Sequence, residues 1–168
     1  MISRNIFADI VWAIILVMFQ IIVLNRIVIL QKYTPVMYPI FILFYPFFRN
    51  RYVFLALSFI LGLSIDIHLG TWGINALAST TIAYFRTIIF RTSTDTTTDF
   101  FSFQSLQWSQ FVIFILTSIF FHQLIVQYLE FFKLSRFLEI LLNVLATTGI
   151  SFIFIILFAI AFKIKERV

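Results

Sequence analysis

The chain is a succession of apolar runs, each close to the length that a helix needs to cross a membrane. A spanning helix needs about 20 mostly apolar residues. Hydrophobic residues make up 62% of the sequence and charged residues 11%, whereas a soluble domain carries about 25% charged residues. We therefore expect an all-α, polytopic membrane protein in which residues 1–168 form a single transmembrane domain. The six runs are Ile6–Leu30, Tyr33–Phe48, Tyr52–Leu69, Trp72–Phe90, Trp108–Phe132 and Phe137–Phe162.

The second run, Tyr33–Phe48, is the weakest candidate for a spanning helix. It is short, and it contains Pro39 and Pro46. Proline removes a backbone donor and kinks a helix, so neighbouring helices must satisfy the carbonyl groups that are freed. We therefore expect six transmembrane helices, with five helices and a re-entrant second segment as the alternative.

Lys and Arg residues are divided unequally between the two sides that six spans define. One side has eight of them and the other has four. Because Lys and Arg in short loops mark the cytoplasmic side, we expect both termini, and a loop at about 91–107, to be cytoplasmic. The eight are Arg4, Arg49, Arg51, Arg86, Arg91, Lys163, Lys165 and Arg167, and the four are Arg26, Lys32, Lys133 and Arg136.

Polar residues within the apolar runs gather at one level, toward the outer face. Asp66 lies in the third run, Gln20 and Asn25 in the first and His122 in the fifth. Because polar groups are costly in hydrocarbon, we expect an interhelical cluster in which Asp66 bonds to His122 or Gln20. The alternatives are an outward-facing ligand cavity and side chains that reach the lipid headgroups. The inner halves of the runs are expected to be almost purely apolar, with Arg86 extending to the headgroups.

Small residues form a stripe on the third and fourth runs. Their spacing places them on one face of each predicted helix, and such faces let two helices approach closely. The neighbour is expected to be a helix of the same chain, with a helix of a partner protein as the alternative. The stripe consists of Ser58 and Gly62 on the third run and Ala76, Ser79, Thr80 and Ala83 on the fourth.

Residues suited to catalysis or metal binding are scarce. The chain has no Cys, two His and four Gly, so thiol chemistry, a metal site and a glycine-rich phosphate loop are not expected. An aspartyl protease needs two carboxylates that share a proton, but Asp9 and Asp66 are expected in opposite halves of the membrane. The basic residues form no stripe suited to nucleic acid. The sequence thus predicts a non-catalytic protein without cofactor, metal or nucleic-acid partner.

A resemblance to a known family rests mainly on the first 90 residues. The stretch FQIIVLN from Phe19 to Asn25 comes first, followed by Pro35, Tyr38 and Pro46. The strongest match is FILGLSIDIHLGTWGINALASTTIAYFR, which ends at Arg86. In these stretches the chain resembles the MreD family of rod-shape-determining membrane proteins, especially its Bacteroidetes-like members. The matching positions of the last stretch are Gly62, Asp66, Gly73, Ala76, Tyr84 and Arg86.

The resemblance implies a non-catalytic scaffold of the cell (inner) membrane. MreD-type proteins associate with MreC, a single-span protein with an outer domain. Together they link cytoplasmic MreB filaments to the peptidoglycan synthases of the elongation complex, and so control cell shape. For this chain, the surfaces expected to contact partners are the small-residue stripe of the fourth run and the proline-bearing second run.

The resemblance also implies a fold similar to that of the S components of energy-coupling-factor transporters. The alternative function is therefore a substrate-binding membrane subunit of a vitamin transporter of that type. Such subunits carry Ala-x-x-x-Ala on the first helix to dock the coupling protein. In this chain Ala8 and Ala13 are five residues apart, so that docking signature is missing.

Overall fold

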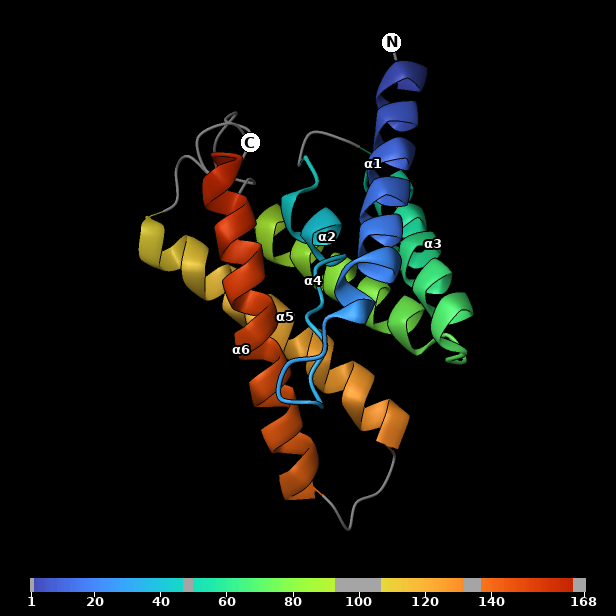
Figure 1. The fold of residues 1–168 in the computed structure, drawn as a ribbon. Coiled ribbons are helices and arrows are strands. Elements are labelled where there is room, and N and C mark those ends of the chain that lie inside the picture. The colour runs from blue at the N-terminus through green and yellow to red at the C-terminus, as the bar shows by residue number, and fades with distance from the viewer. Residues whose placement is uncertain (1, 47–49, 93–106, 132–136, 165–168) are drawn as a thin grey trace.

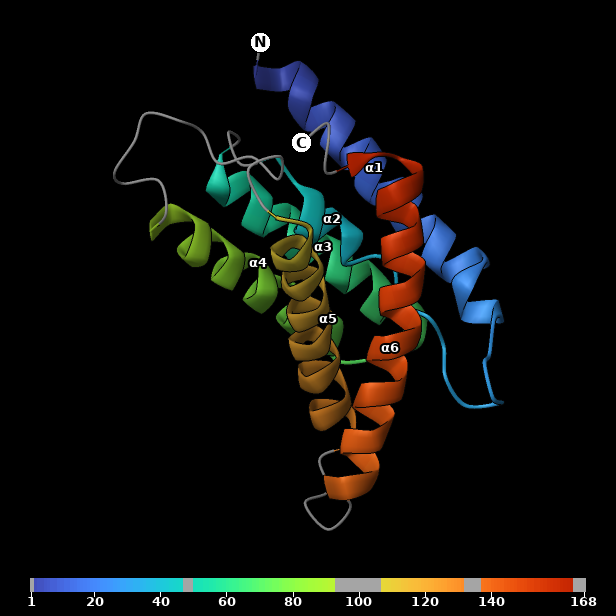
Figure 2. The same cartoon turned by 90° about the vertical axis from the view of Figure 1, so that its left-hand side faces the viewer.

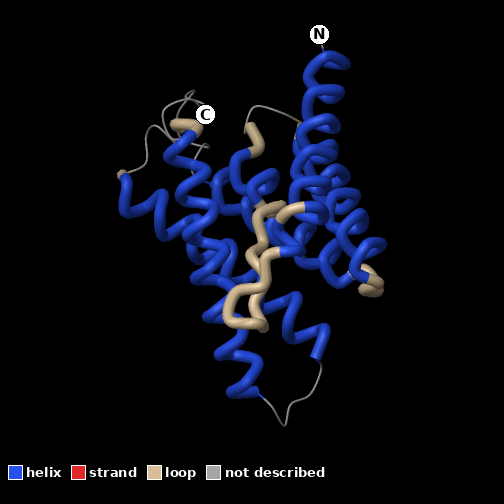
Figure 3. Tube along the Cα trace, viewed as in Figure 1, coloured by secondary structure: helices blue, strands red, loops and turns tan. Residues whose placement is uncertain are grey.

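The computed structural model describes residues 2–46, 50–92, 107–131 and 137–164 (Figures 1 and 3). Within these ranges the chain is helical apart from its turns, loops and one isolated bridge between Ile29 and Tyr33, so the all-α prediction is confirmed. Most of the expected cytoplasmic loop, residues 93–106, lies outside the described ranges. The elements are α1 (Ile2–Ile22), the short 3-10 helix η1 (Leu24–Arg26), α2 (Ile40–Phe44), α3 (Arg51–Leu69), α4 (Ile74–Thr92), α5 (Trp108–Phe131) and α6 (Phe137–Ala161).

In the described part of the chain, four segments are long and apolar enough to cross a membrane, and the apolar part of α4, Ile74–Phe90, is slightly shorter. Large apolar side chains cover their outward faces, as Phe7 on α1 and Leu138 on α6 show with exposed fractions of 69% and 74%. In water such a surface would drive association, whereas hydrocarbon solvates it. The chain is therefore a membrane-embedded helical protein. The four segments are Ile6–Arg26, Arg51–Leu69, Trp108–Phe131 and Phe137–Ala161.

The expected helix over Tyr33–Phe48 is wrong over most of its length. Among residues 33–46, which the structure describes, only the five residues of α2 are helical, with Pro39 at the N-cap position. The residue before a proline disfavours helical dihedrals, and Tyr45, which precedes Pro46, is extended with φ −62° and ψ 134°. The two prolines thus confine the helix to a single short stretch.

We call residues 35–45 the central segment, because α2 lies inside the bundle. The five side chains of α2 are at most 9% exposed, and the helix contacts α1, α3 and α4. Figures 1 and 2 show the central segment returning through the bundle toward the end at which α1 begins. Irregular backbone is tolerated at membrane depth only where protein buries it, so the long helices enclose the segment that could not face lipid.

The helices α3 and α4 form a closely packed hairpin. A Cβ atom added to Gly62 would lie 2.5 Å from the carbonyl oxygen of Asn75, so only glycine lets the two backbones approach this closely. Ala76 and Ala83 are at most 1% exposed. The stripe of small residues therefore packs within the chain, as expected, and the alternative, in which it receives a partner helix, is wrong.

Candidate functional site

Asp66, near the end of α3, caps the start of α4. Its carboxylate accepts hydrogen bonds from the hydroxyl of Thr71 (2.5 Å), from the backbone and side-chain amides of Asn75 (3.0 and 2.9 Å) and from the backbone amide of Ala76 (2.8 Å). The first backbone amides of a helix have no partner within the helix, and a carboxylate is favourable at that end. Asp66 is thus the N-terminal cap of α4, supplied by the preceding helix.

The turn between α3 and α4 brings the carboxylate to that position. Gly70 ends α3 in the left-handed region at φ 71°, and its backbone amide bonds to the carbonyl oxygen of Asp66. The backbone amide of Thr71 bonds to the same carbonyl oxygen at 3.0 Å. Gly73 also has a positive φ, of 84°. Both glycines supply a conformation that other residues adopt only with strain.

Asp66 is linked to His122 through two intermediate side chains. The hydroxyl of Tyr38 donates to Oδ1 of Asn75 (2.7 Å) and lies 3.0 Å from Nε2 of His122. A hydroxyl has one proton to donate, so His122 donates to Tyr38 through Nε2. The expected direct bond from Asp66 to His122 or Gln20 is therefore wrong, because local donors occupy both carboxylate oxygens. We call Tyr38, Asp66, Thr71, Asn75 and His122 the Asp66 cluster.

Gln20 binds the backbone of the central segment. Its Nε2 donates to the carbonyl oxygen of Pro35 (3.0 Å) and to Oδ1 of Asn25 (2.9 Å), and its Oε1 accepts from the backbone amide of Met37 (2.8 Å). From α6, the hydroxyl of Ser151 accepts from the backbone amide of Val36 at 2.9 Å. Side chains of α1 and α6 therefore replace the hydrogen bonds that a helix would have made here.

A second polar group lies at the other end of the central segment. Arg86 is 4% exposed, donates to the carbonyl oxygen of Tyr45 and lies 5.1 Å from the centre of the Phe54 ring. The hydroxyl of Tyr45 donates to Oδ2 of Asp9 at 3.0 Å. The prediction that Arg86 extends to the headgroups is therefore wrong. The prediction that the inner halves of the apolar runs are almost purely apolar is wrong as well. The end of α2 before Pro46 leaves a carbonyl group that Arg86 satisfies. We call Asp9, Tyr45, Phe54 and Arg86 the Arg86 cluster.

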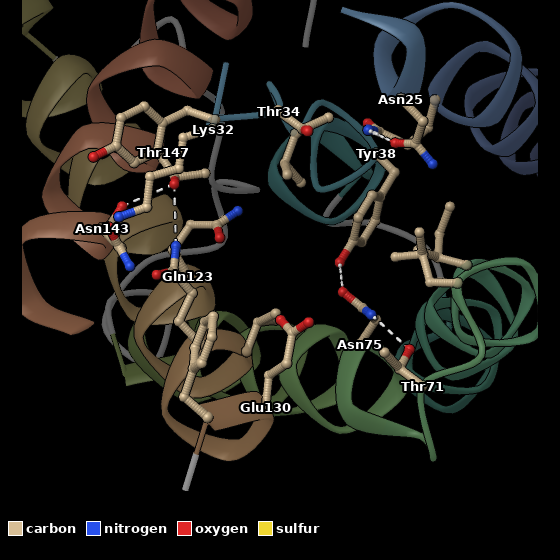
Figure 4. Close-up of a pocket in the computed structure, with 18 residues that line it drawn as sticks. Asn25, Lys32, Thr34, Tyr38, Thr71, Asn75, Gln123, Glu130, Asn143 and Thr147 are labelled. Carbon is tan, nitrogen blue, oxygen red and sulfur yellow. Dashed lines mark hydrogen bonds between the residues drawn. The ribbon is translucent and has the colours of Figure 1, made fainter. Parts of the chain in front are cut away.

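A cavity of about 430 Å³ lies beside the Asp66 cluster. Figure 4 shows side chains of α5 and α6 on one side of it and side chains of η1, the central segment and the α3–α4 hairpin on the other. The same level of the bundle thus holds both a polar cluster and a cavity, which the sequence left as alternatives. The polar lining residues are Gln20, Asn25, Lys32, Tyr33, Thr34, Tyr38, Thr71, Asn75, Gln123, Gln127, Glu130, Asn143 and Thr147.

The residues predicted from sequence thus fall into three places. Gln20, Asn25, Asp66 and His122 lie at or beside the cavity, whereas Arg86 belongs to the separate cluster at the other end. Site residues that the prediction missed are the two tyrosines of the central segment and Asn75. Asn75 follows Asp66 by nine residues across a glycine turn, which is a signal that sequence reasoning could have used. The remaining predicted residues shape the chain: Pro39 and Pro46 flank α2, Gly62, Ala76 and Ala83 are buried in the bundle, and Gly73 forms the turn.

The described residues contain no group of three or more His, Asp and Glu side chains that could hold a metal ion. Because four donors already surround Asp66, its geometry is that of a structural acceptor. No protein-family model, curated protein or solved structure matches the chain. The fold and the site therefore define a class, a membrane-embedded helical bundle with a buried polar network and an adjoining cavity.

Proposed function

We propose that the chain is a non-catalytic membrane scaffold of the MreD type. In this role it binds an MreC-type single-span protein and helps to couple MreB filaments to peptidoglycan synthases. The observation that carries the proposal is the Asp66 cap, because three other residues of the resemblance have defined structural tasks in the same hairpin. Gly62 admits the backbone of α4, Gly73 forms the turn and Ala76 donates to Asp66. The resembling stretch thus specifies a fixed hairpin, as a scaffold requires.

The partner of such a scaffold would bind on the outer faces of the helices. The small-residue stripe and the central segment are both buried within the chain, so neither is offered to another protein. Exposed apolar side chains remain on the opposite face of α4, including Leu77, Tyr84 and Phe85 with exposed fractions of 53–54%. Packing between such faces is how helices associate in lipid, and a single-span partner has one helix to contribute.

We also propose six passes through the cell (inner) membrane, with the central segment as the second pass and both termini in the cytoplasm. Supporting this, α1 begins and α6 ends at the same end of the bundle (Figures 1 and 2). Lys32 lies in the loop that follows the opposite end of α1, between η1 and α2. Labelling of single cysteines from outside the cell tests the orientation. Modification at Lys32→Cys, with protection at Lys163→Cys, is the expected result.

Affinity purification of the tagged protein from its native membranes tests the scaffold proposal. Recovery of MreC and wall synthases is expected for the unaltered chain, and much less for Asp66→Asn after correction for protein amount. His68→Gln is the matched control, because His68 lies on the same helix and is exposed. Purification without MreC or wall synthases would contradict the scaffold assignment.

A substrate-binding subunit of an energy-coupling-factor-type transporter is the second candidate, and the cavity is the observation that favours it. At about 430 Å³ it falls within the range of about 300–1,000 Å³ typical of small-molecule sites. The same purification separates the two functions. Recovery of an ATPase module in place of MreC would establish the transporter subunit and exclude the scaffold.

A further inference from the structure

The cavity beside the Asp66 cluster is lined largely by amide and hydroxyl side chains. Gln123, Gln127 and Asn143 face it from α5 and α6, and all three are at most 8% exposed. Asn25 and Tyr38 face it from the other side (Figure 4). Amide groups both donate and accept hydrogen bonds, so this lining suits an occupant that can do both.

Two of these side chains carry polar atoms without a partner in the described part of the chain. Gln127 donates through Nε2 to the hydroxyl of Thr147 at 3.1 Å, but its buried Oε1 accepts nothing. Asn25 accepts from Gln20 through Oδ1, but its buried Nδ2 donates to nothing. Buried polar atoms in native proteins nearly always have a partner. Two side chains that line the cavity thus each carry one buried polar atom without a partner among the described residues.

The charges around the cavity limit the ligand further. Lys32 and Glu130 are its charged lining residues, and both are exposed. Their charges are opposite and cancel, while the buried lining residues are neutral. Burial of an ion without a counter-charge is costly. The lining therefore favours a ligand without net charge.

We propose that this cavity is a binding site for an uncharged small molecule that bears hydroxyl and amide groups. The hydroxyl and amide groups of the ligand bond to the amide side chains that line the cavity, which are those of Asn25, Gln123, Gln127 and Asn143. A free sugar derivative and the sugar headgroup of a lipid share this chemistry. The proposal rests on the cavity and does not depend on the scaffold function.

N-acetylglucosamine is a suitable probe, because it has one amide, several hydroxyls and no charge. We would place the full chain in phosphatidylcholine nanodiscs, which contain no sugar, and titrate the free sugar and its octyl glycoside separately. Saturable binding of either form is expected. Binding of both forms identifies a free solute as the source, and binding of the glycoside alone identifies a lipid headgroup.

The variant Gln127→Leu tests whether the sugar binds at the amide side chains that line the cavity. Loss of one lining amide is expected to weaken binding about tenfold, the effect of one hydrogen bond. Gln110→Leu is the matched control, because Gln110 is an exposed amide on the same helix outside the cavity. Asn143→Leu serves as a second variant and is expected to weaken binding in the same way. Size-exclusion profiles and helical circular dichroism confirm that each variant is folded.

Two results would overturn the inference. Failure of both probe forms to bind the unaltered, folded chain would mean that the cavity holds water only. Equal binding by the unaltered chain, Gln127→Leu and Asn143→Leu would place the sugar elsewhere. Neither result bears on recovery of MreC, so the ligand and scaffold proposals stand or fall separately.

Discussion

The two helical hairpins of this protein carry polar residues at the same level but use them differently. In the α3–α4 hairpin, Asp66 accepts four hydrogen bonds and fixes the start of α4. In the α5–α6 hairpin, Gln127 has a buried oxygen without a partner among the described residues and faces a cavity. Whether a polar residue in an apolar run has a structural role or a binding role therefore depends on the atoms that it contacts.

The central segment explains part of this difference. Its non-helical part needs hydrogen-bond partners at membrane depth, and Gln20 and Ser151 satisfy the backbone of residues 35–37. Tyr38 is held by Asn75 and His122. Polar residues near the central segment are thus committed to structure, whereas Gln127, across the cavity, bonds to Thr147 through Nε2 and keeps an oxygen without a partner among the described residues.

Asp66→Asn gives the largest expected loss of stability, about 3 kcal/mol. An asparagine has one acceptor oxygen in place of two. Its amide nitrogen would therefore face donors that the second carboxylate oxygen now accepts from. Those donors would lose their acceptor, which is costly for buried groups. Equilibrium unfolding in mixed micelles measures this loss. The exposed His68→Gln variant, two residues away, should unfold like the unaltered chain. Wild-type stability of Asp66→Asn would mean that Asp66 does not cap α4.

Gly62→Ala should cost about 2 kcal/mol, in the range for overpacked sites. The new Cβ atom would lie 2.5 Å from a backbone oxygen, and backbone cannot move aside as a flexible side chain can. Gly149→Ala is the matched control, because nothing lies within 4 Å of its added Cβ and alanine favours helix by about 1 kcal/mol. The comparison fails if both substitutions shift the unfolding midpoint in the same direction.

Arg86→Met should cost about 1–2 kcal/mol, because it leaves the buried carbonyl group of Tyr45 without this donor. Arg86→Lys should recover part of the loss, since lysine retains a donor and a positive charge over the Phe54 ring. The unfolding assay used for the Asp66 variant measures both. If methionine is as stable as arginine at this position, Arg86 does not hold the end of the central segment.

Much of the fold was predictable because hydropathy dominates it. The third and sixth runs were expected at Tyr52–Leu69 and Phe137–Phe162, and the helices observed are Arg51–Leu69 and Phe137–Ala161. The central segment was not predictable in the same way. Its apolar composition fits a spanning helix, and only enclosure by other helices allows its extended form.

The sequence predicted that the polar residues of the candidate site lie at one level of the bundle, but it did not predict which of them contact one another. Asp66 and Asn75 are close in sequence, so a turn at Gly70 could have suggested their pairing. His122 reaches the same cluster only through Tyr38, which follows from the three-dimensional packing of α5 against the central segment. The inward position of Arg86 depends likewise on a carbonyl group that no sequence pattern marks.

The most direct test of this account is to unfold Asp66→Asn and Gln127→Leu side by side under one condition. Gln127→Leu should lie within about 1 kcal/mol of the unaltered chain. It removes the bond from Nε2 to Thr147, but it also removes an unpartnered oxygen, and Thr147 keeps its bond to the carbonyl oxygen of Asn143. Asp66→Asn should be less stable by several times that amount. Equal stability losses in the two variants would contradict the division between a structural hairpin and a hairpin that is open to a ligand.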